Sequence, residues 1–270
     1  MWGGRKPVID EIQTYLGADG LMHCTVCKES VEAFYPKGSL LEMRKHHRQC
    51  ACERQAYAEE AQYYKEKEHR ELIARNKKIC FEEKEMEGFT FQNVDRDSGV
   101  IKIAEEYVTN WQKMKQNHIG YLFWGPVGTG KSYLAACIAN ALLEQEVTVK
   151  MTNFNTILND LFAAEDKTEY IRSLNVYELL IIDDLGVERN SEYALENIFS
   201  VIDWRYRSGR PLIITTNIPL VQLKQETKIE KKRIYDRILE RCIPVKIDGV
   251  SRREAMANDN MQTMKNILKI

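Results

Sequence analysis

An eight-residue stretch, Gly125–Ser132, limits the possible fold of this chain more than any other segment. It reads Gly-Pro-Val-Gly-Thr-Gly-Lys-Ser, the G-x-x-x-x-G-K-[ST] pattern of phosphate-binding loops. An apolar run at 120–124 precedes it and a helical pattern at 133–143 follows it, which is the strand–loop–helix context that the motif requires. A glycine-rich turn with a solvated lysine is the plainer alternative, but it leaves the coincidence of three glycines with a Lys-Ser pair unexplained. The stretch therefore predicts a nucleotide-phosphate site.

The residues of this loop have distinct expected roles in holding ATP. Its glycines let backbone N–H groups curl around phosphate oxygens, which the N-terminus of the following helix also attracts. Lys131 is expected to reach the β- and γ-phosphates, and the Ser132 hydroxyl to coordinate Mg²⁺. The predicted cofactor-binding residues of the loop are Gly125, Pro126, Val127, Gly128, Thr129, Gly130, Lys131 and Ser132.

Strand-like and helical segments alternate in the second part of the chain. Strands are expected at 120–124, 147–152, 179–184, 211–216 and 243–247, and helices include 100–114 and 191–207. Such alternation predicts an α/β fold of the P-loop NTPase type, with a parallel sheet flanked by helices. Ligands of these sheets bind at the carboxyl ends of the strands, where the motifs below fall.

The third expected strand ends in two aspartates, about 50 residues after the phosphate loop. An apolar strand with an acidic end matches the Walker B arrangement, so Asp183 is expected to hold Mg²⁺ together with Ser132. Asp184 occupies the position where many ATPases place a glutamate that polarises the attacking water. Its side chain is one methylene shorter, which leaves its reach to that water open. Two carboxylates in a strand-ending turn are the alternative interpretation.

Two further polar features lie at or after the fourth strand. Asn217 ends that strand, where a carboxamide orients the water or bonds the γ-phosphate, the role called sensor 1; an isolated asparagine is otherwise a turn former. Arg233, Arg237 and Arg241 stand four apart and form one helical stripe. We expect Arg237 to be an arginine finger offered to the nucleotide of a neighbouring subunit, a solvated helix face being the alternative. The predicted catalytic residues are Asp184, Asn217 and Arg237.

Four of the seven cysteines are concentrated near the N-terminus, as a C-x₂-C pair and a C-x-C pair. A structural Zn²⁺ would supply folding free energy to a domain too small for its own core. The predicted zinc ligands are Cys24, Cys27, Cys50 and Cys52. Replacement of one cysteine by His46 or His47, and unligated thiols, both stay open. Upstream, the apolar positions between Val8 and Leu16 predict a short helix ending near Gly17.

The length of 270 residues, the net charge and the apolar content limit which partners and domains the chain can have. A net charge of −1 gives no overall basic field, so any contact with nucleic acid must be local. No apolar run approaches the roughly 20 residues that span a bilayer, and no signal peptide is recognisable, so we expect a cytoplasmic protein without a membrane partner. The expected division is a zinc-binding domain at 1–55, a charged helical linker at 56–88 and an ATPase domain at 89–270.

Taken together, four of these motifs carry a family resemblance: the phosphate loop, Leu-Ile-Ile-Asp-Asp-Leu-Gly, Ile-Ile-Thr-Thr-Asn and Tyr-Asp-Arg-Ile. The chain from about residue 89 to 255 resembles the DnaC/DnaI-type replicative helicase loaders, a branch of the AAA+ ATPases that also includes IstB-type transposition helpers. The cysteine-bearing region resembles, less distinctively, the zinc-binding and helicase-contacting domain of some loaders.

The resemblance implies further site residues and a variation of the fold. Arg237, in Tyr-Asp-Arg-Ile, matches the finger arginine of the family. Arg253 is the position that best matches its second sensor, with Arg252 a close competitor. Only about 20 residues follow the fifth strand, which is too few for the usual helical lid of AAA+ proteins.

The function implied by the resemblance is ATP-dependent loading of a hexameric replicative DNA helicase onto single-stranded DNA. ATP binding and hydrolysis would switch the assembly and release of a nucleotide-dependent oligomer of this chain. An IstB-type transposition helper, which binds duplex DNA and a transposase, is the second interpretation. The third is an adaptor that binds nucleotide with little hydrolysis.

Overall fold

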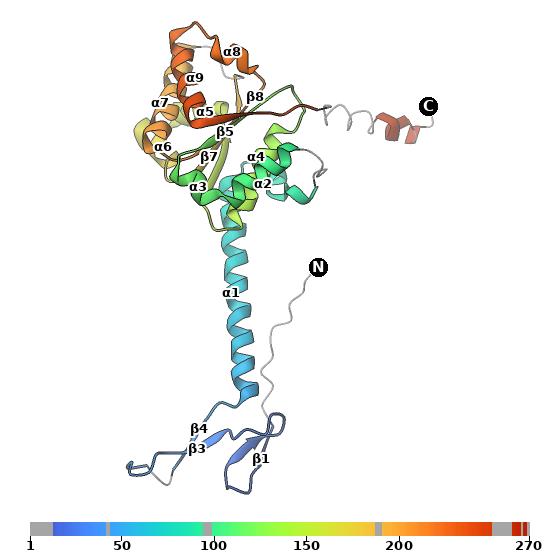
Figure 1. Ribbon diagram of the computed structural model, residues 1–270, viewed down its shortest axis with the longest axis vertical. Helices are drawn as coiled ribbons and strands as arrows, with labels where there is room; N and C mark the ends of the chain where they lie inside the picture. The colour runs from blue at the N-terminus through green and yellow to red at the C-terminus, as the bar shows by residue number, and fades with distance from the viewer. Residues whose placement is uncertain are drawn as a thin grey trace. The chain divides into compact units, whose positions relative to one another are not determined.

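The computed structural model describes residues 13–41, 44–93, 99–186, 191–249, 261–265 and 267–268 (Figure 1). The chain forms two compact units, Met1–Leu72 and Ile73–Ile270, and the boundary between them falls within helix α1 (Ala51–Cys80). The finer division into 1–55, 56–88 and 89–270 stays a prediction.

The first unit is built from two short antiparallel strand pairs and the first part of α1. Strand β1 (Thr14–Leu16) pairs with β2 (Met22–Cys24), and β3 (Glu32–Phe34) pairs with β4 (Lys45–His47). The helix predicted to end near Gly17 is wrong at 14–16, because these residues pair with β2; residues 8–12 lie outside the described part. Three buried residues, Cys24, Val31 and Cys50, form the small core of this unit.

The second unit contains the predicted five-stranded sheet. Its strands are β5 (Gly120–Trp124), β6 (Val149–Asn153), β7 (Leu179–Leu185), β8 (Leu212–Thr216) and β9 (Cys242–Lys246). All neighbours are parallel, in the order β6-β7-β8-β5-β9. The phosphate loop follows β5, and the carboxyl ends of β8 and β7 come next along the sheet.

The helices of the second unit follow the expected alternation with one interruption. They are α2 (Gly99–Thr109), α3 (Trp111–Gln116), α4 (Lys131–Leu143), α5 (Phe154–Ala163), α6 (Lys167–Leu174), α7 (Glu192–Ser208), α8 (Leu220–Lys224) and α9 (Ile229–Arg241), with 3₁₀ turns η1 (Lys84–Gly88) and η2 (Phe91–Asn93). The single helix predicted at 100–114 is two helices. The Asn110 side chain donates to the Glu106 carbonyl where α2 ends, a local bond that competes with helix continuation.

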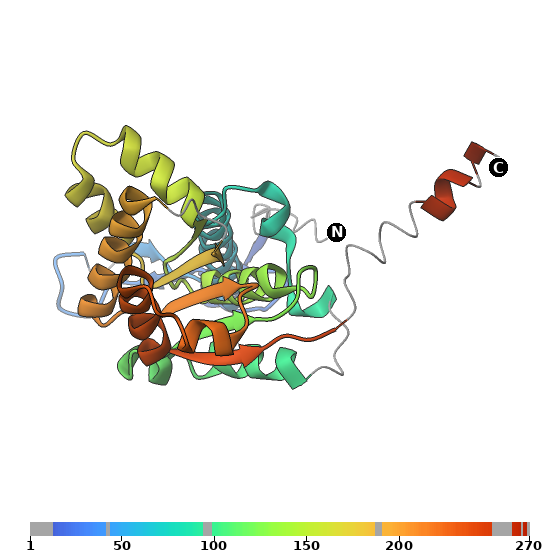
Figure 2. The ribbon, with the colours of Figure 1, turned by 90° about the horizontal axis from the view of Figure 1, so that it is seen from above.

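Helices cover both faces of this sheet (Figure 2). Leu179 and Ile181 of β7 belong to the apolar cluster that includes α2 and α4, whereas Leu180 and Ile182 belong to the cluster with α5, α7 and α9. Side chains alternate across a strand, so the continuous apolar run of β7 is buried on both sides. The sheet is thereby fixed between two helical layers, and its carboxyl edge is left to carry polar side chains.

A buried arginine joins α7 to the opposite, amino edge of the sheet. Arg205 is 1% exposed, and its guanidinium donates to the carbonyls of Tyr177, Glu178 and Pro211, which precede β7 and β8. Burial lowers the pKa of Arg205 to about 9, which still leaves it charged at neutral pH. This side chain fixes where two strands begin and therefore the register with which they reach the carboxyl edge.

Candidate functional site

The phosphate loop has a backbone that requires its glycines. Gly125, Gly128 and Gly130 have φ angles of 150°, 80° and 92°, in the region that favours glycine. A Cβ atom at Gly125 would lie 2.1 Å from the carbonyl oxygen of Ile247, so no side chain fits there. The loop leaves β5 at Trp124 and enters α4 at Lys131, which is the predicted strand–loop–helix order.

The lysine of the loop lies folded against the loop itself. Lys131 is 5% exposed, and its Nζ atom donates to the carbonyl oxygens of Gly125 at 3.1 Å and Pro126 at 2.7 Å. The Thr129 hydroxyl donates to the same Pro126 carbonyl at 2.9 Å. The ammonium group is therefore already held within the loop that is expected to take the phosphates. Ser132 follows in the first turn of α4 and is partly buried.

A backbone hydrogen bond connects the loop to the end of β8, next to Asn217. The Gly125 N–H donates to the Thr216 carbonyl at 3.3 Å, and Asn217 is the next residue after β8. The structure thus brings Asn217, as the sequence predicts, to the edge of the sheet where the phosphate loop begins.

The two aspartates at the end of β7 lie in a β-bulge. Ile182 pairs with Ile214 and Leu185 with Thr216, so Asp183 and Asp184 together face the single residue Thr215. Asp184 has a φ of 57° and is exposed, whereas Asp183 is partly buried. The Thr215 hydroxyl donates to Asp183 Oδ1 and accepts from the Asp184 N–H at 3.0 Å. The sequence did not single out Thr215, although a Thr-Thr pair ending an apolar strand marked the position.

The oxygen donors at this edge suit Mg²⁺. Mg²⁺ prefers carboxylate and hydroxyl oxygens and uses few protein ligands besides phosphate and water. β8 alone separates β5, which leads into the phosphate loop, from β7, which ends in the two aspartates, so these two strands lie about two strand spacings, or roughly 10 Å, apart. The residues predicted to hold Mg²⁺ therefore follow strands that end at the same edge of the sheet.

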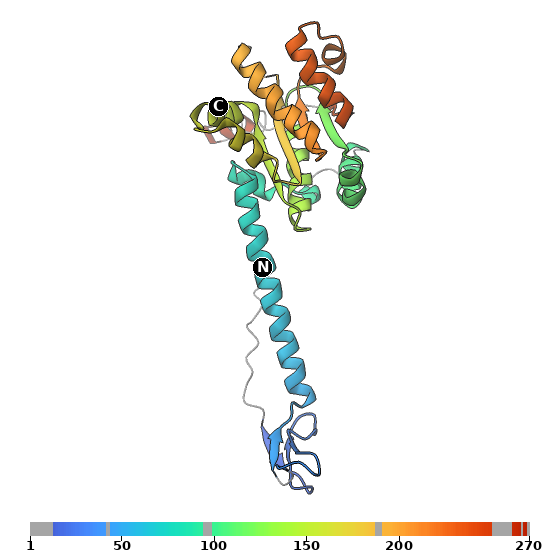
Figure 3. The ribbon, with the colours of Figure 1, turned by 90° about the vertical axis from the view of Figure 1, so that its left-hand side faces the viewer.

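The predicted arginine stripe exists, and it faces α7 of the same chain. Arg237 is held by Asp203, whose Oδ1 atom accepts from Nε at 2.7 Å, and it lies over the Phe199 ring at 4.6 Å. Arg233 lies 4.2 Å from the centre of the same ring, and Arg241 lies over the Tyr206 ring on α7. Figure 3 shows α7 and α9 side by side. The finger role of Arg237 stays a prediction, and Arg252 and Arg253 lie outside the described residues.

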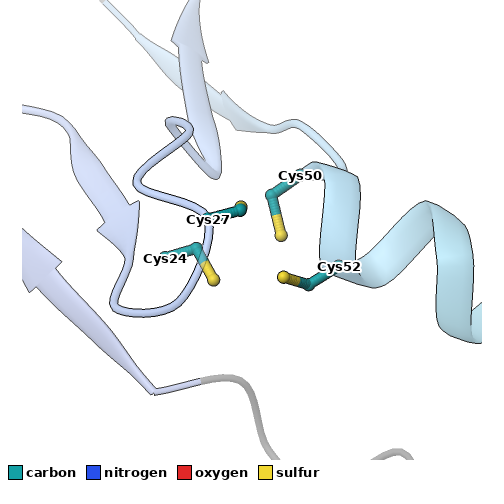
Figure 4. A group of neighbouring side chains, drawn as sticks. All are labelled: Cys24, Cys27, Cys50 and Cys52. Atoms are coloured by element: carbon teal, nitrogen blue, oxygen red, sulfur yellow. The ribbon is translucent and has the colours of Figure 1, made fainter.

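The four predicted zinc ligands converge in the first unit. Their Sγ atoms all lie within 4.8 Å of one another. Cys24 ends β2 and Cys27 lies in the turn that follows, whereas Cys50 directly precedes α1 and Cys52 lies in its first turn (Figure 4). A tetrahedral zinc with 2.3 Å bonds would place its sulfurs about 3.8 Å apart, so small shifts would close the group around an ion.

The histidines near this cluster are engaged elsewhere. His46 Nδ1 lies 2.9 Å from the His47 carbonyl, and His47 Nε2 lies 3.0 Å from Glu53 Oε1. The potential ligand group found among the described residues contains the four cysteines alone. This geometry favours a four-cysteine site over one in which His46 or His47 replaces a cysteine.

Backbone groups favour the thiolate at Cys27, whereas burial raises the pKa of the Cys50 and Cys52 thiols. The N–H groups of Glu29 and Cys52 lower the pKa of the Cys27 thiol to about 6, and the Val26 N–H donates to Cys24 Sγ at 3.4 Å. Zinc binds the thiolate form of cysteine. The donor set therefore fits a structural zinc ion, whose identity remains a proposal.

Comparison with known proteins decides the family. A model of the family described as IstB-like ATP binding protein matches residues 55–259, which are 205 of the 270 residues. The chain belongs to this family. An IstB-like protein binds ATP, which agrees with the nucleotide-phosphate site predicted at Gly125–Ser132.

Two curated relatives of this IstB-like chain carry the name replicative helicase loader. DnaC of Escherichia coli (strain K12) is 29% identical over 140 residues, which cover 50% of this chain and 55% of the relative. DnaI of Bacillus subtilis (strain 168) is 25% identical over 194 residues, which cover 65% of this chain and 62% of the relative. The chain thus matches little more than half the length of each.

Solved structures confirm the predicted fold class for the IstB-like unit. A crystal structure of DnaI matches with a TM-score of 0.57 and 24% identity, covering 66% of this chain and 99% of the other. A crystal structure of the DnaC helicase loader matches with a TM-score of 0.54 and 20% identity, covering 62% and 100%. Within the described part of the chain, no helix combines the length and apolar character needed to cross a membrane.

Proposed function

We propose that this chain is a cytoplasmic, ATP-dependent loader that delivers a hexameric replicative DNA helicase onto single-stranded DNA. The observation that carries the proposal is the similarity of the nucleotide-binding unit to two proteins named replicative helicase loaders. The arrangement of the phosphate loop, Asp183 and Asn217 at one edge of the sheet supports it.

The residues at this edge of the sheet would have separate roles in binding and hydrolysing ATP. Lys131 would leave the Gly125 and Pro126 carbonyls for the β- and γ-phosphates, and Ser132 and Asp183 would hold Mg²⁺. The bound ion would neutralise charge on the phosphates. Asp184 and Asn217 would orient the attacking water. The proposal is supported by hydrogen bonds that already join the loop to the end of β8, and the end of β8 to the two aspartates of β7.

Completion of the site would come from a second copy of the chain. Arg237 is the proposed finger, and Asp203 holds its Nε atom, which aligns the guanidinium along α7. Hydrolysis would then depend on assembly, and ATP would act as a switch for forming and releasing the oligomer. The four-cysteine unit would hold zinc and contact the helicase.

A reconstituted loading reaction tests the proposal. The full chain, the replicative helicase of the same organism, ATP and single-stranded DNA circles coated with single-strand-binding protein are combined, and unwinding of an annealed strand is measured. The parent protein should support unwinding, whereas Lys131→Ala should not. Lys167→Ala, which removes an exposed lysine far along the chain from the loop, is the matched control and should behave as the parent. Equal unwinding with and without the parent protein contradicts loading.

A second candidate function is an ATP-dependent transposition helper, because the chain belongs to the IstB-like family and its motifs also resemble those of IstB-type transposition helpers. Such a protein would bind duplex DNA and a transposase. Affinity capture with the full chain as bait, offered equal amounts of replicative helicase and of an insertion-sequence transposase, separates the two. Selective retention of the transposase would reverse the ranking.

A nucleotide-binding adaptor with little hydrolysis is distinguished by phosphate release. Asp184→Asn removes the carboxylate that is proposed to act on the attacking water. We expect slow release by the parent, stimulated by single-stranded DNA, and a further fall in the variant. If parent and variant release phosphate at the same background rate, the adaptor interpretation holds.

A further inference from the structure

The end of β7 is held by one side chain of the neighbouring strand, and that side chain touches both aspartates. Thr215 is 0% exposed and lies in β8, opposite the bulge formed by Asp183 and Asp184. A threonine hydroxyl offers one proton and two lone pairs. Here the proton goes to Asp183 Oδ1 and one lone pair accepts the Asp184 N–H at 3.0 Å.

We propose that Thr215 is the positioning residue of the metal-holding carboxylate, which it orients for Mg²⁺ bound with nucleotide. The proposal rests on the proposed ATP-binding function of this edge and adds a residue to it. A bond from a hydroxyl to a carboxylate is charge-assisted and short, so it fixes the rotation of the Asp183 side chain. With Oδ1 turned to Thr215, the second oxygen, Oδ2, is the one presented to the ion.

The same hydroxyl also stabilises the unusual backbone beside Asp183. Asp184 has a φ of 57°, a conformation that is unfavourable for a residue with a side chain. The bulge leaves the Asp184 N–H outside the regular ladder between β7 and β8, and Thr215 supplies its acceptor. One side chain therefore holds both the carboxylate of Asp183 and the backbone N–H of Asp184, whose side chain is exposed.

The next residue of β8 provides a matched control. Thr216 is also 0% exposed, but its hydroxyl donates to the Leu185 carbonyl at 2.7 Å and accepts from the Ile218 N–H at 3.0 Å. Neither bond involves an aspartate side chain. Loss of the Thr216 hydroxyl thus reproduces the cost of removing a buried hydroxyl without changing the orientation of Asp183.

The test compares Thr215→Val, Thr215→Ser and Thr216→Val in the full chain. The affinity for ATP is measured by titration calorimetry with EDTA and at increasing MgCl₂. In Thr215→Val, affinity without Mg²⁺ should stay that of the parent, because the phosphate loop is untouched. The gain in affinity that Mg²⁺ provides should fall by about tenfold, the size typical for loss of a group that orients a metal ligand. Thr215→Ser should restore it, and Thr216→Val should keep the Mg²⁺ response.

A double-mutant cycle distinguishes an effect of Thr215 on Asp183 from a general effect on the stability of the fold. If Thr215 acts through Asp183, Thr215→Val should change the Mg²⁺ response little further in an Asp183→Asn background. Thermal unfolding of each variant records any general loss of stability. Equal Mg²⁺ responses in Thr215→Val and Thr216→Val, or additive effects of Thr215→Val and Asp183→Asn, overturn the proposal.

The Mg²⁺ response of these variants can be interpreted whether or not the protein loads a helicase. A normal Mg²⁺ response in a protein that fails to load any helicase contradicts the proposed loading function and leaves the role of Thr215 standing. An ATP affinity of the parent that is indifferent to Mg²⁺ contradicts the role of Thr215, whatever the protein loads.

Discussion

The two units of this chain are stabilised by different means. The nucleotide-binding unit buries two extensive apolar clusters, one on each face of a five-stranded sheet. Among its described residues, the cysteine unit buries only Cys24, Val31 and Cys50, with Met22, Cys27 and Cys52 packed against them, and it exposes Leu16, Val26 and Leu40. A sheet covered on both faces supports its own fold, whereas four short strands of three residues each do not.

The difference shows where polar groups can be placed. In the nucleotide-binding unit the apolar interior holds the sheet, so strand ends are free to carry Asp183 and Asn217. In the cysteine unit, cysteine side chains make up most of the small core, and the metal that they are expected to hold would be part of the fold. Substitution of a metal ligand should therefore unfold the cysteine unit, whereas substitution of a phosphate ligand should leave the nucleotide-binding unit folded.

Removal of the metal should have the largest effect, and it should be confined to one unit. Structural zinc contributes on the order of 10 kcal/mol of folding free energy in small metal-dependent domains. We expect a chelator, or Cys50→Ser, to abolish hydrogen-exchange protection of β1 to β4 while the sheet of the second unit stays protected. Metal content is measured alongside. The control is Cys242→Ala, a buried cysteine of the second unit, which should leave metal content unchanged. Persistent protection of the strands without metal would show that the units are not so different.

Arg205→Met should have the next largest effect, and it should act on the second unit alone. Its guanidinium donates to the carbonyls of Tyr177, Glu178 and Pro211. The Tyr177 carbonyl also accepts from Arg210 and the Pro211 carbonyl from the Leu180 N–H, so the Glu178 carbonyl depends most on Arg205. Because a buried acceptor left without a donor costs about 1–3 kcal/mol, we expect a loss of about 2–3 kcal/mol in urea unfolding of the nucleotide-binding unit. Arg210→Ala removes an exposed arginine that bonds the Val176 carbonyl and should cost far less. Similar losses in both variants would contradict the burial argument.

Arg205 and Thr215 also show what the sequence could not reveal. The phosphate loop is a local signal, because its glycines, Lys131 and Ser132 lie within eight residues and next to the strand and helix that they need. The partners of Arg205 include backbone carbonyls up to 28 residues away, and Thr215 lies 31 and 32 residues from its aspartates. The acceptors of Arg205 are backbone carbonyls, which carry no residue identity, and the contact between Thr215 and Asp183 depends on the pairing of β8 with β7.

The incorrect or incomplete helix predictions have local causes. At 14–16 a short apolar pattern agreed with a helix, but these residues form a strand that pairs with β2. Three residues are too few to distinguish the periodicity of a helix from that of a strand. At Asn110 a side-chain bond to the Glu106 carbonyl interrupted a pattern that was otherwise helical. The arginine stripe was correct in spacing, and only the structure shows that Phe199 and Tyr206 lie opposite it.

Arg237→Ala should destabilise the second unit moderately, and by more than Arg207→Ala, which removes the other arginine bonded to Asp203. Arg237 Nε and Arg207 Nε lie 2.7 and 2.8 Å from the two oxygens of Asp203, but the side chains are 25% and 75% exposed. Arg237 also lies over the Phe199 ring. We expect a loss of about 1–2 kcal/mol for Arg237→Ala and under about 0.5 kcal/mol for Arg207→Ala. Equal losses in urea unfolding would mean that burial and ring contact do not distinguish the two ion pairs.

The smallest effect is expected in α1, within the part that belongs to the cysteine unit. Lys67 Nζ lies 3.9 Å from Glu71 Oε1, with side chains 52% and 71% exposed, so the pair is largely screened by water. Lys67→Ala should change stability by about 0.3 kcal/mol, the usual size for an exposed i,i+4 pair. Metal-loaded protein is unfolded with urea and monitored by hydrogen exchange of β1 to β4. A loss several times larger would show that helix charges, and not the sulfur cluster alone, hold this unit, which would weaken the contrast with the nucleotide-binding unit.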